Sequence, residues 1–268
     1  MVRAIPDVLA RIVDSKRDGL PFLRASRDSL DARAAARSSF RDFRASLAAA
    51  RSAGVSEKTP AIIAEVKKAS PSKGVLADRF DPAAIARAYA SGGAAALSVL
   101  TDAEFFQGSL DDLESARAAV AIPVLRKDFT LDEVHVVEAA AHGADAILLI
   151  AALLEETELR KLRELAARYR MAALVEVHDA AELDAAIGSG AEIVGVNNRN
   201  LHTFEVTLEA SLRLASKIPS GVIKVSESGI DSRAAVTQLQ EAGFDAFLVG
   251  EHLMRAPDPG AALHELLS

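Results

Sequence analysis

The sequence contains no cysteine among its 268 residues. This absence excludes a disulfide scaffold, a thiolate metal site, an iron–sulfur cluster and a cysteine nucleophile. It also fits the reducing cytoplasm, and the first residues lack the apolar core of a secretory signal. We therefore expect a cytoplasmic protein.

Long apolar runs are also missing, since none reaches the roughly 18 residues that a membrane-spanning helix needs. Half of the residues are hydrophobic and 26% are charged, a composition typical of folded rather than disordered chains. The net charge of −7 argues against non-specific binding of nucleic acid. The length allows a sizeable core, and α/β barrels often reach it as a single domain.

From about residue 60 onward the chain repeats a strand–helix unit. Each expected strand is a short, mostly apolar run, which is typical of a strand buried on both faces. The eight runs are 62–66, 96–100, 122–126, 146–150, 173–177, 193–196, 222–225 and 246–249. Their spacing leaves room for one helix between neighbours.

Helix signals occupy the intervals between these runs. Asp81 and Pro82 predict a helix start, and glycines such as Gly93 predict helix ends just before the next strand. Eight alternating units favour an α/β fold of the closed (β/α)8 TIM-barrel type over an open doubly wound sheet. The chain also lacks the Gly-x-Gly-x-x-Gly pattern expected of a Rossmann sheet.

Residues 1–58 lie outside the repeat. We expect residues 1–268 to form one domain, with 1–58 as an N-terminal helical extension and 59–268 as the eight βα units. Apolar spacing predicts a helix from Pro6-Asp7 onward and a second helix over 30–50 that includes Phe40, Phe43 and Leu47. Residues 24–51 hold seven arginines and three aspartates. This basic segment could bind nucleic acid, but a solvated helical face is favoured, and we expect the extension to cover and brace the barrel mouth.

Polar residues follow the expected strands where a barrel of this kind carries its chemistry. They include Glu65, Lys67, Lys127, Glu176, Asn197 and Glu227. One such residue alone would suggest a rim salt bridge, but residues from five strands at one mouth favour a functional site. Lysines and carboxylates together suit proton transfer, although Lys127 could instead form a Schiff base.

Two glycine-containing turns, 226–231 and 249–252, are each expected to lead into a helix N-terminus, which predicts a phosphate site. The six histidines show no metal-ligand spacing, so no metal site is expected. His178 follows Glu176 at strand spacing, and we favour a supporting or rim role for it over catalysis.

Six segments carry a closer resemblance. They are 63–74 (IAEVKKASPSKG), 123–129 (PVLRKDF), 174–178 (LVEVH), 195–201 (GVNNRNL), 226–230 (SESGI) and 249–254 (VGEHLM). In this order they resemble the indole-3-glycerol phosphate synthase family over about residues 5–265. Departures are small: Lys68 stands where arginine is common, and His252 where a small residue is frequent.

The resemblance implies a carboxy-lyase of tryptophan biosynthesis. Its substrate would be 1-(2-carboxyphenylamino)-1-deoxyribulose 5-phosphate, which closes a carbon–carbon bond and then loses CO2 and water to give indole-3-glycerol phosphate. The resemblance implies no cofactor, and its only implied partner is this phosphorylated small molecule. We expect no binding of nucleic acid or membrane, and the sequence points to no protein partner.

The resemblance also implies roles for single residues. Lys127 would be the acid of ring closure, held in place by Glu65, and Glu176 the base of dehydration. Lys67 would anchor phosphate or carboxylate, with a role as the dehydration acid left open. Asn197, Arg199 and Glu227 would orient substrate groups and the lysines. Ser70 would also bind substrate, Pro71, Phe106, Phe129 and Leu201 would enclose the ring, and Ser228, Gly229, Gly250 and Glu251 would hold phosphate.

Two rival readings differ in class. Other phosphate-binding barrels, such as phosphoribosylanthranilate isomerase or the tryptophan synthase α chain, do not explain the segments 63–74 and 123–129. An inactive barrel that binds nucleic acid or a partner through its basic arm would not need the intact set of Glu65, Lys67, Lys127 and Glu176.

Overall fold

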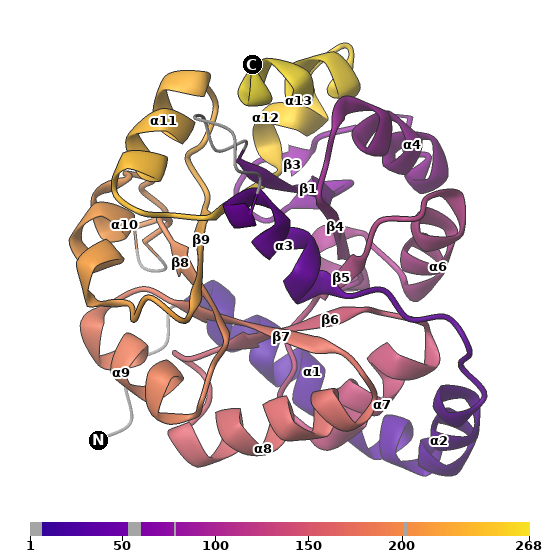
Figure 1. Ribbon diagram of the computed structural model, residues 1–268. Helices are drawn as coiled ribbons and strands as arrows, with labels where there is room; N and C mark the ends of the chain where they lie inside the picture. Colours follow the sequence, from indigo (N-terminus) through magenta and orange to yellow (C-terminus); the bar gives the residue numbers. More distant parts are fainter. Residues whose placement is uncertain (1–6, 53–59, 78, 201–202) are drawn as a thin grey trace.

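Eight parallel strands close into one barrel in the computed structural model, which describes residues 7–52, 60–77, 79–200 and 203–268 (Figure 1). Around the barrel the strands follow the order β1-β10-β9-β8-β7-β6-β5-β4. Neighbours in the chain are thus neighbours in the sheet, with helices between them, and the expected (β/α)8 TIM barrel is confirmed.

The barrel strands lie close to the predicted runs. They are β1 (Ala61–Val66), β4 (Ala96–Leu100), β5 (Val124–Lys127), β6 (Ala146–Ile150), β7 (Ala172–Val177), β8 (Ile193–Asn197), β9 (Ile223–Glu227) and β10 (Ala246–Val249). The loop after β1 also forms a small hairpin of β2 (Ala69–Ser70) and β3 (Gly74–Val75), which the sequence did not reveal.

Helices surround the barrel in chain order. They are α4 (Pro82–Gly92), α5 (Ala103–Phe106), α6 (Leu110–Ala119), α7 (Glu133–Ala141), α8 (Glu156–Arg168), α9 (Ala180–Gly188), α10 (Glu209–Leu214), the 3-10 turn η1 (Ala215–Lys217), α11 (Arg233–Glu241), α12 (Glu251–Arg255) and α13 (Pro259–Leu267). The predicted limits of α4 are confirmed, since Asp81 caps its first turn and Gly93 ends it at a φ of 101°. Within the described residues no helix is long and apolar enough to cross a membrane.

The extension supplies three helices: α1 (Asp7–Ala25), α2 (Arg27–Ala35) and α3 (Phe43–Ser52). In Figure 1, α3 lies across the near end of the barrel, while α1 lies behind it. Phe43 and Leu47 of α3 are fully buried among residues that begin the strands, including Ile193 and Ile223. Helix α3 thus closes the amino end of the barrel, and the cavity lies at the opposite end.

The prediction of one helix over 30–50 is wrong. Residues 36–42 leave the helix because their arginines bind the barrel: Arg37 pairs with the buried Asp145, and Arg41 donates to the carbonyl oxygens of Ile122 and Arg117. Phe40 does not lie on a helical stripe. Its ring instead stacks under the Arg170 guanidinium, whose Cζ lies 4.0 Å from the centre of the Phe40 ring. These partners are distant in sequence, so apolar spacing alone could not reveal the break.

The basic segment is largely neutralised within the molecule. Arg24 pairs with Asp132, Arg33 with Glu114 and Arg44 with Glu192, in addition to the contacts of Arg37 and Arg41. Most of these acceptors lie on the barrel and its helices. The arginines that the structure describes in this segment therefore brace the extension against the barrel.

Candidate active site

The carboxyl ends of the strands surround one cavity of about 1260 Å³. Fifteen of the sixteen predicted site residues line it: Glu65, Lys67, Ser70, Pro71, Phe106, Lys127, Phe129, Glu176, Asn197, Arg199, Glu227, Ser228, Gly229, Gly250 and Glu251. The sixteenth, Leu201, lies outside the described residues. Side chains from β1, β5, β7, β8 and β9 thus meet at the end of the barrel where such folds carry their chemistry.

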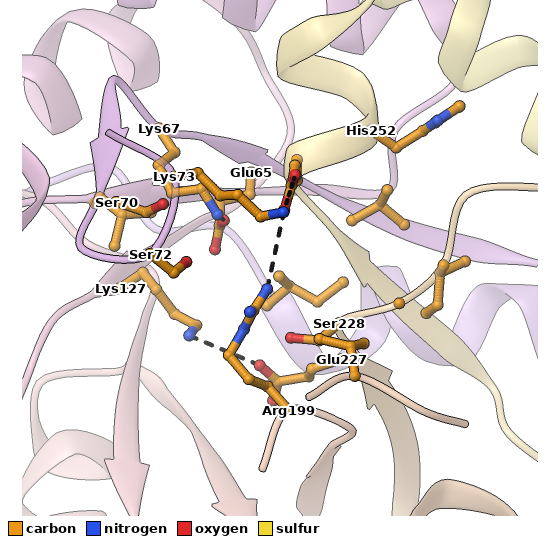
Figure 2. Close-up of a pocket in the computed structure, with 18 of the residues that line it drawn as sticks. Glu65, Lys67, Ser70, Ser72, Lys73, Lys127, Arg199, Glu227, Ser228 and His252 are labelled. Carbon is orange, nitrogen blue, oxygen red and sulfur yellow. Dashed lines mark hydrogen bonds and ion pairs between the residues drawn. The ribbon is translucent and has the colours of Figure 1, made fainter. Parts of the chain in front are cut away.

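Lys127 at the end of β5 occupies the centre of the charged group. Its Nζ lies 3.5 Å from Glu176 Oε2 and 3.8 Å from Glu227 Oε2, and Figure 2 shows Lys127 and Glu227 pointing toward each other. Burial lowers the pKa of Lys127, but the nearby Glu176, Glu227 and Glu65 outweigh it and raise that pKa overall. Lys127 is therefore a cation at neutral pH, which suits an acid better than a Schiff-base amine.

Glu65 and Lys67 extend from the end of β1 and form an ion pair with each other. Burial raises the pKa of Glu65, but Lys67 and Lys127 together lower it below the usual range. Gly250 makes room for this pair, because a Cβ there would overlap Glu65 Oε1 and lie 3.1 Å from Lys67 Nζ. A second ammonium is therefore held at the cavity wall, beside the expected phosphate site.

Glu176 on β7 is the ionised carboxylate of the group. Burial raises its pKa, but Lys127 and then His178 lower it, as does a hydrogen bond from Asn197. The net pKa is below the usual range. A buried carboxylate that stays ionised beside a lysine can accept a proton from bound substrate.

Glu227 on β9 behaves in the opposite way. Burial and the nearby Glu176 raise its pKa to about 8, despite the opposing effect of Lys127. Its Oε1 is buried and makes no hydrogen bond to the described residues. The Glu227 carboxyl group packs against Gly195. A Cβ on residue 195 would overlap Glu227 Oε1, so this position of the carboxyl group requires glycine there. The pKa of Glu227 is thus raised where that of Glu176 is lowered, so Glu227 holds a proton more readily than Glu176, and Glu176 is the better proton acceptor of the two.

The turn after β9 forms the floor of the predicted phosphate site. Ser228 and Gly229 both have positive φ, of 68° and 77°, and Asn198 donates to the Ser228 carbonyl oxygen at 3.1 Å. The predicted helix start after this turn is confirmed, since α11 begins at Arg233 directly after its cap, Ser232. Likewise, α12 begins directly after Gly250. Backbone N–H groups of both turns remain near the cavity.

A rim of charged side chains borders this region. The Glu251 carboxylate lies 3.6 Å from Lys73 Nζ, 3.9 Å from Arg199 and 3.4 Å from Arg255. The sequence predicted Arg199 and Glu251 as substrate-binding residues and placed Asn198 among the polar residues at a strand end, but it did not assign a role to Lys73. Lys73 and Asn198 lie within the segments that resemble the family, and only their folded positions show their proximity to the site.

The apolar side of the cavity combines Phe106, Phe129 and Pro71 with Val8, Leu9 and Ile12 of α1. Lys16 on α1 joins the two aromatic loops. Its Nζ lies 2.9 Å from Asp102, which caps the helix of Phe106, and 2.7 Å from Asp128, which precedes Phe129. The extension therefore borders the mouth as expected and is anchored there by buried charge.

The histidines do not combine with carboxylates into a metal site. In the ranges that the structure describes, no group of three or more His, Asp or Glu side chains could hold a metal ion. His178 instead lies between Glu176 and Glu182, at 3.5 and 3.0 Å.

Comparisons with known proteins agree on one family. The family model described as "Indole-3-glycerol phosphate synthase" matches residues 9–266. Curated proteins of that name are similar along the whole chain. The one from Polaromonas sp. is 52% identical over 266 residues (97% of this chain, 98% of the relative), and the one from Albidiferax ferrireducens is 50% identical over 264 residues (98% of each chain).

Solved structures with lower similarity support the fold alone. Thiamine phosphate pyrophosphorylase from Pyrococcus furiosus aligns with a TM-score of 0.59 at 18% identity, covering 78% of this chain and 94% of that one. The fold is therefore widely shared, whereas the full-length match at half identity is specific. The chain belongs to the indole-3-glycerol phosphate synthase family.

Proposed function

We propose that this barrel mouth closes the indole ring of indole-3-glycerol phosphate, with Lys127 as the acid and Glu176 as the base. The protein is then a carboxy-lyase of tryptophan biosynthesis that acts on 1-(2-carboxyphenylamino)-1-deoxyribulose 5-phosphate. The observation that carries the assignment is the position of Lys127 Nζ within 3.8 Å of the carboxyl groups of both Glu176 and Glu227.

Ring closure needs a proton on the substrate C2′ carbonyl oxygen while the ring carbon bearing the carboxylate attacks C2′. Lys127 supplies this proton, because its carboxylate neighbours keep it charged at neutral pH. The adduct carries its positive charge conjugated to the anthranilate nitrogen. Loss of CO2 returns an electron pair to the ring, so this step needs no protein base.

Dehydration needs an acid at the C2′ hydroxyl and a base at the C1′ hydrogen. Glu176 is the base, because it is ionised and buried next to the acid. Glu227, whose pKa is raised, donates to a substrate hydroxyl in its protonated form, and Asn197 orients Glu176 through its hydrogen bond. The two carboxyl groups thus divide the accepting and donating roles between them.

Binding uses the two sides of the cavity. Lys67, Arg199 and the backbone of Ser228, Gly229, Gly250 and Glu251 hold the substrate's anionic groups, while Ser70 borders them. Phe106, Phe129 and Pro71 enclose the aromatic ring, and we place Leu201 with them from the resemblance. No cofactor is proposed, because the protonated carbonyl of the substrate serves as the electron sink.

The proposal treats residues 1–268 as one domain. Residues of α1 line the cavity and residues of α3 close the other barrel end, so the extension has no separate core. A phosphorylated small molecule is the one partner that the site calls for. Action in the cytoplasm, without nucleic acid or membrane, stays part of the proposal.

The direct test is turnover of this substrate by the purified protein in the presence of a chelator, followed by indole fluorescence. We expect product from the wild type and from Lys161→Met, which alters an exposed lysine far from the site. Lys127→Met should give none while remaining folded. Absence of product from the wild type would refute the proposed function.

A further inference from the structure

Asn198 lies directly behind the turn that is proposed to hold phosphate. Among the described residues, Ser228 (Figure 2) and Gly229 of this turn line the cavity, whereas Asn198 does not and is only 3% exposed. The Asn198 Nδ2 atom donates a hydrogen bond of 3.1 Å to the Ser228 carbonyl oxygen. Asn198 therefore contacts the turn from its buried side and does not reach bound substrate.

A buried network holds the Asn198 amide in one orientation. Its Nδ2 also donates to Ser226 Oγ at 3.0 Å, and its Oδ1 accepts a hydrogen bond of 3.1 Å from the Ser211 backbone N–H. The hydroxyl oxygens of Ser211 and Ser226 lie 2.8 Å apart, and both residues are fully buried. Turning the amide over would place Oδ1 against the Ser228 carbonyl oxygen and Nδ2 against the Ser211 N–H, so only one orientation fits.

The hydrogen bond from Asn198 fixes the peptide unit between Ser228 and Gly229. In a planar trans peptide the C=O and N–H bonds point in opposite directions, and the described residues contain no cis peptide bond. Asn198 holds the Ser228 carbonyl oxygen on the buried side. The Gly229 N–H of the same peptide unit therefore points to the other side, where Gly229 lines the cavity.

This peptide orientation depends on backbone angles that serine rarely adopts. Ser228 and Gly229 have φ values of 68° and 77°, in the left-handed region that is uncommon for residues other than glycine. Such a conformation persists only where the surrounding structure supports it. Asn198 gives this support, and Val206 also packs against the turn, since a Cβ on residue 229 would lie 2.6 Å from Val206 Cγ1.

The two successive asparagines have different tasks. Asn197 lines the cavity and makes a hydrogen bond to Glu176. Successive side chains at a strand end point to opposite faces, and Asn198 accordingly faces outward, to Ser211 of α10. The substrate side and the supporting side of the turn thus each receive one amide.

We propose that Asn198 is a positioning residue for phosphate, which orients the Gly229 N–H group toward a phosphate oxygen of the substrate. The inference rests on the proposed function for the identity of the phosphate ester. It adds a residue that sets phosphate affinity without touching substrate. A backbone N–H that meets an oxyanion makes one of the stronger hydrogen bonds in proteins, so loss of Asn198 should weaken phosphate binding and leave the aromatic side of the cavity unaffected.

Inorganic phosphate is the probe, because its binding to the full-length protein is measured without turnover. Asn198→Leu keeps the approximate size of the side chain but removes its donor and its acceptor. Calorimetric titration should give a Kd for phosphate at least about tenfold above that of the wild type, since a hydrogen bond to a charged group typically contributes this much. The KM of the substrate should rise in parallel with little change in kcat, as expected for lost binding that is equal in the ground state and the transition state.

Two further measurements distinguish positioning from a general loss of structure. Anthranilate carries the aromatic ring and the carboxylate of the substrate but no phosphate, so its Ki should be the same for the wild type and Asn198→Leu. In 15N-labelled wild-type protein the amide resonance of Gly229 should shift on addition of phosphate. At the same phosphate concentration this shift should be smaller in Asn198→Leu.

A second variant, Ser226→Ala, tests the network if Asn198→Leu folds poorly. It removes the hydroxyl that accepts from Asn198 Nδ2, so the Kd for phosphate should rise by about threefold, as expected for loss of one neutral hydrogen bond behind the turn. Ser189→Ala is the matched control, because it removes an equally buried hydroxyl that donates to the Ala186 carbonyl oxygen at the end of α9. Its Kd for phosphate should equal that of the wild type.

An unchanged Kd for phosphate in folded Asn198→Leu would overturn the inference. Equal losses of phosphate and anthranilate binding in that variant, or the same Kd for phosphate in Ser226→Ala and Ser189→Ala, would also overturn it. Failure of the proposed function is a different result, because the wild type would then form no indole, whereas the phosphate titrations do not depend on turnover.

Discussion

Lys16 is the most informative single side chain for testing how the extension is attached. Its ammonium lies between Asp102 and Asp128, whose side chains are only 4% and 3% exposed, at 2.9 and 2.7 Å. Replacement by methionine keeps the length and apolar stem of the side chain but removes the charge. Two buried carboxylates then lose their shared cation.

The expected cost follows from this geometry. Removing one partner of a buried ion pair typically destabilises a protein by about 3–5 kcal/mol, because the remaining charge stays buried. Arg126 still compensates Asp128 at 3.2 Å, so we expect about 3 kcal/mol, at the low end of that range. This is a large part of the total stability of roughly 5–15 kcal/mol.

Urea unfolding of Lys16→Met measures this cost, with Lys161→Met as the control. Lys161 makes an equally short pair of 2.6 Å with Glu133, but its side chain is 68% exposed, so its loss should leave the free energy of unfolding nearly unchanged. Lys16→Met combined with Asp102→Asn should recover part of the loss, because the remaining carboxylate, Asp128, is still compensated by Arg126. Equal, small losses in Lys16→Met and Lys161→Met would refute the reasoning.

Two further predictions concern Glu227. In Gly195→Ala the new methyl group would overlap Glu227 Oε1 and lie 3.1 Å from Leu174 Cδ1, so we expect kcat to fall by about 10²-fold through misplacement of this carboxyl group. Gly221→Ala, which meets nothing within 4 Å, should leave kcat unchanged, and equal rates in the two variants would contradict the assignment. Separately, Glu227 has a folded-state pKa of about 8 against an ordinary 4.5, so the folded state holds a proton that the unfolded state loses. As the pH rises from the ordinary pKa of 4.5 toward about 8, the free energy of unfolding of the wild type should fall more steeply than that of Glu227→Gln. Urea unfolding at about pH 5.5 and about pH 8.5 measures this difference. Parallel slopes would show that Glu227 is ionised at neutral pH.

The strand pattern was predictable because each run is apolar on both faces and is followed by polar residues at one end. Glu65, Lys127, Glu176 and Glu227 each lie within two residues of the carboxyl end of such a run, so barrel geometry alone places them at one mouth. The break between α2 and α3 was not predictable, because it depends on Asp145, about a hundred residues from Arg37.

Ion pairs between residues far apart in the sequence could not be predicted, for the same reason. From the sequence alone, Lys16 is one of several charged residues on an amphipathic helix. Only the folded structure shows that it pairs with Asp102 and Asp128. The protonation of Glu227 likewise depends on Glu176 and Lys127 from other strands. The charged side chains at the barrel mouth shift one another's pKa values, and they come from strands far apart in the sequence.

The central claim is the division of work between Lys127 and Glu176, and parallel measurement of CO2 and indole in one turnover tests it most directly. Lys127→Ala should release neither, because ring closure lacks its acid. Glu176→Gln should release CO2 but form little indole, because only dehydration lacks its base. Indole formation at the wild-type rate by Glu176→Gln, or CO2 release at that rate by Lys127→Ala, would contradict the account.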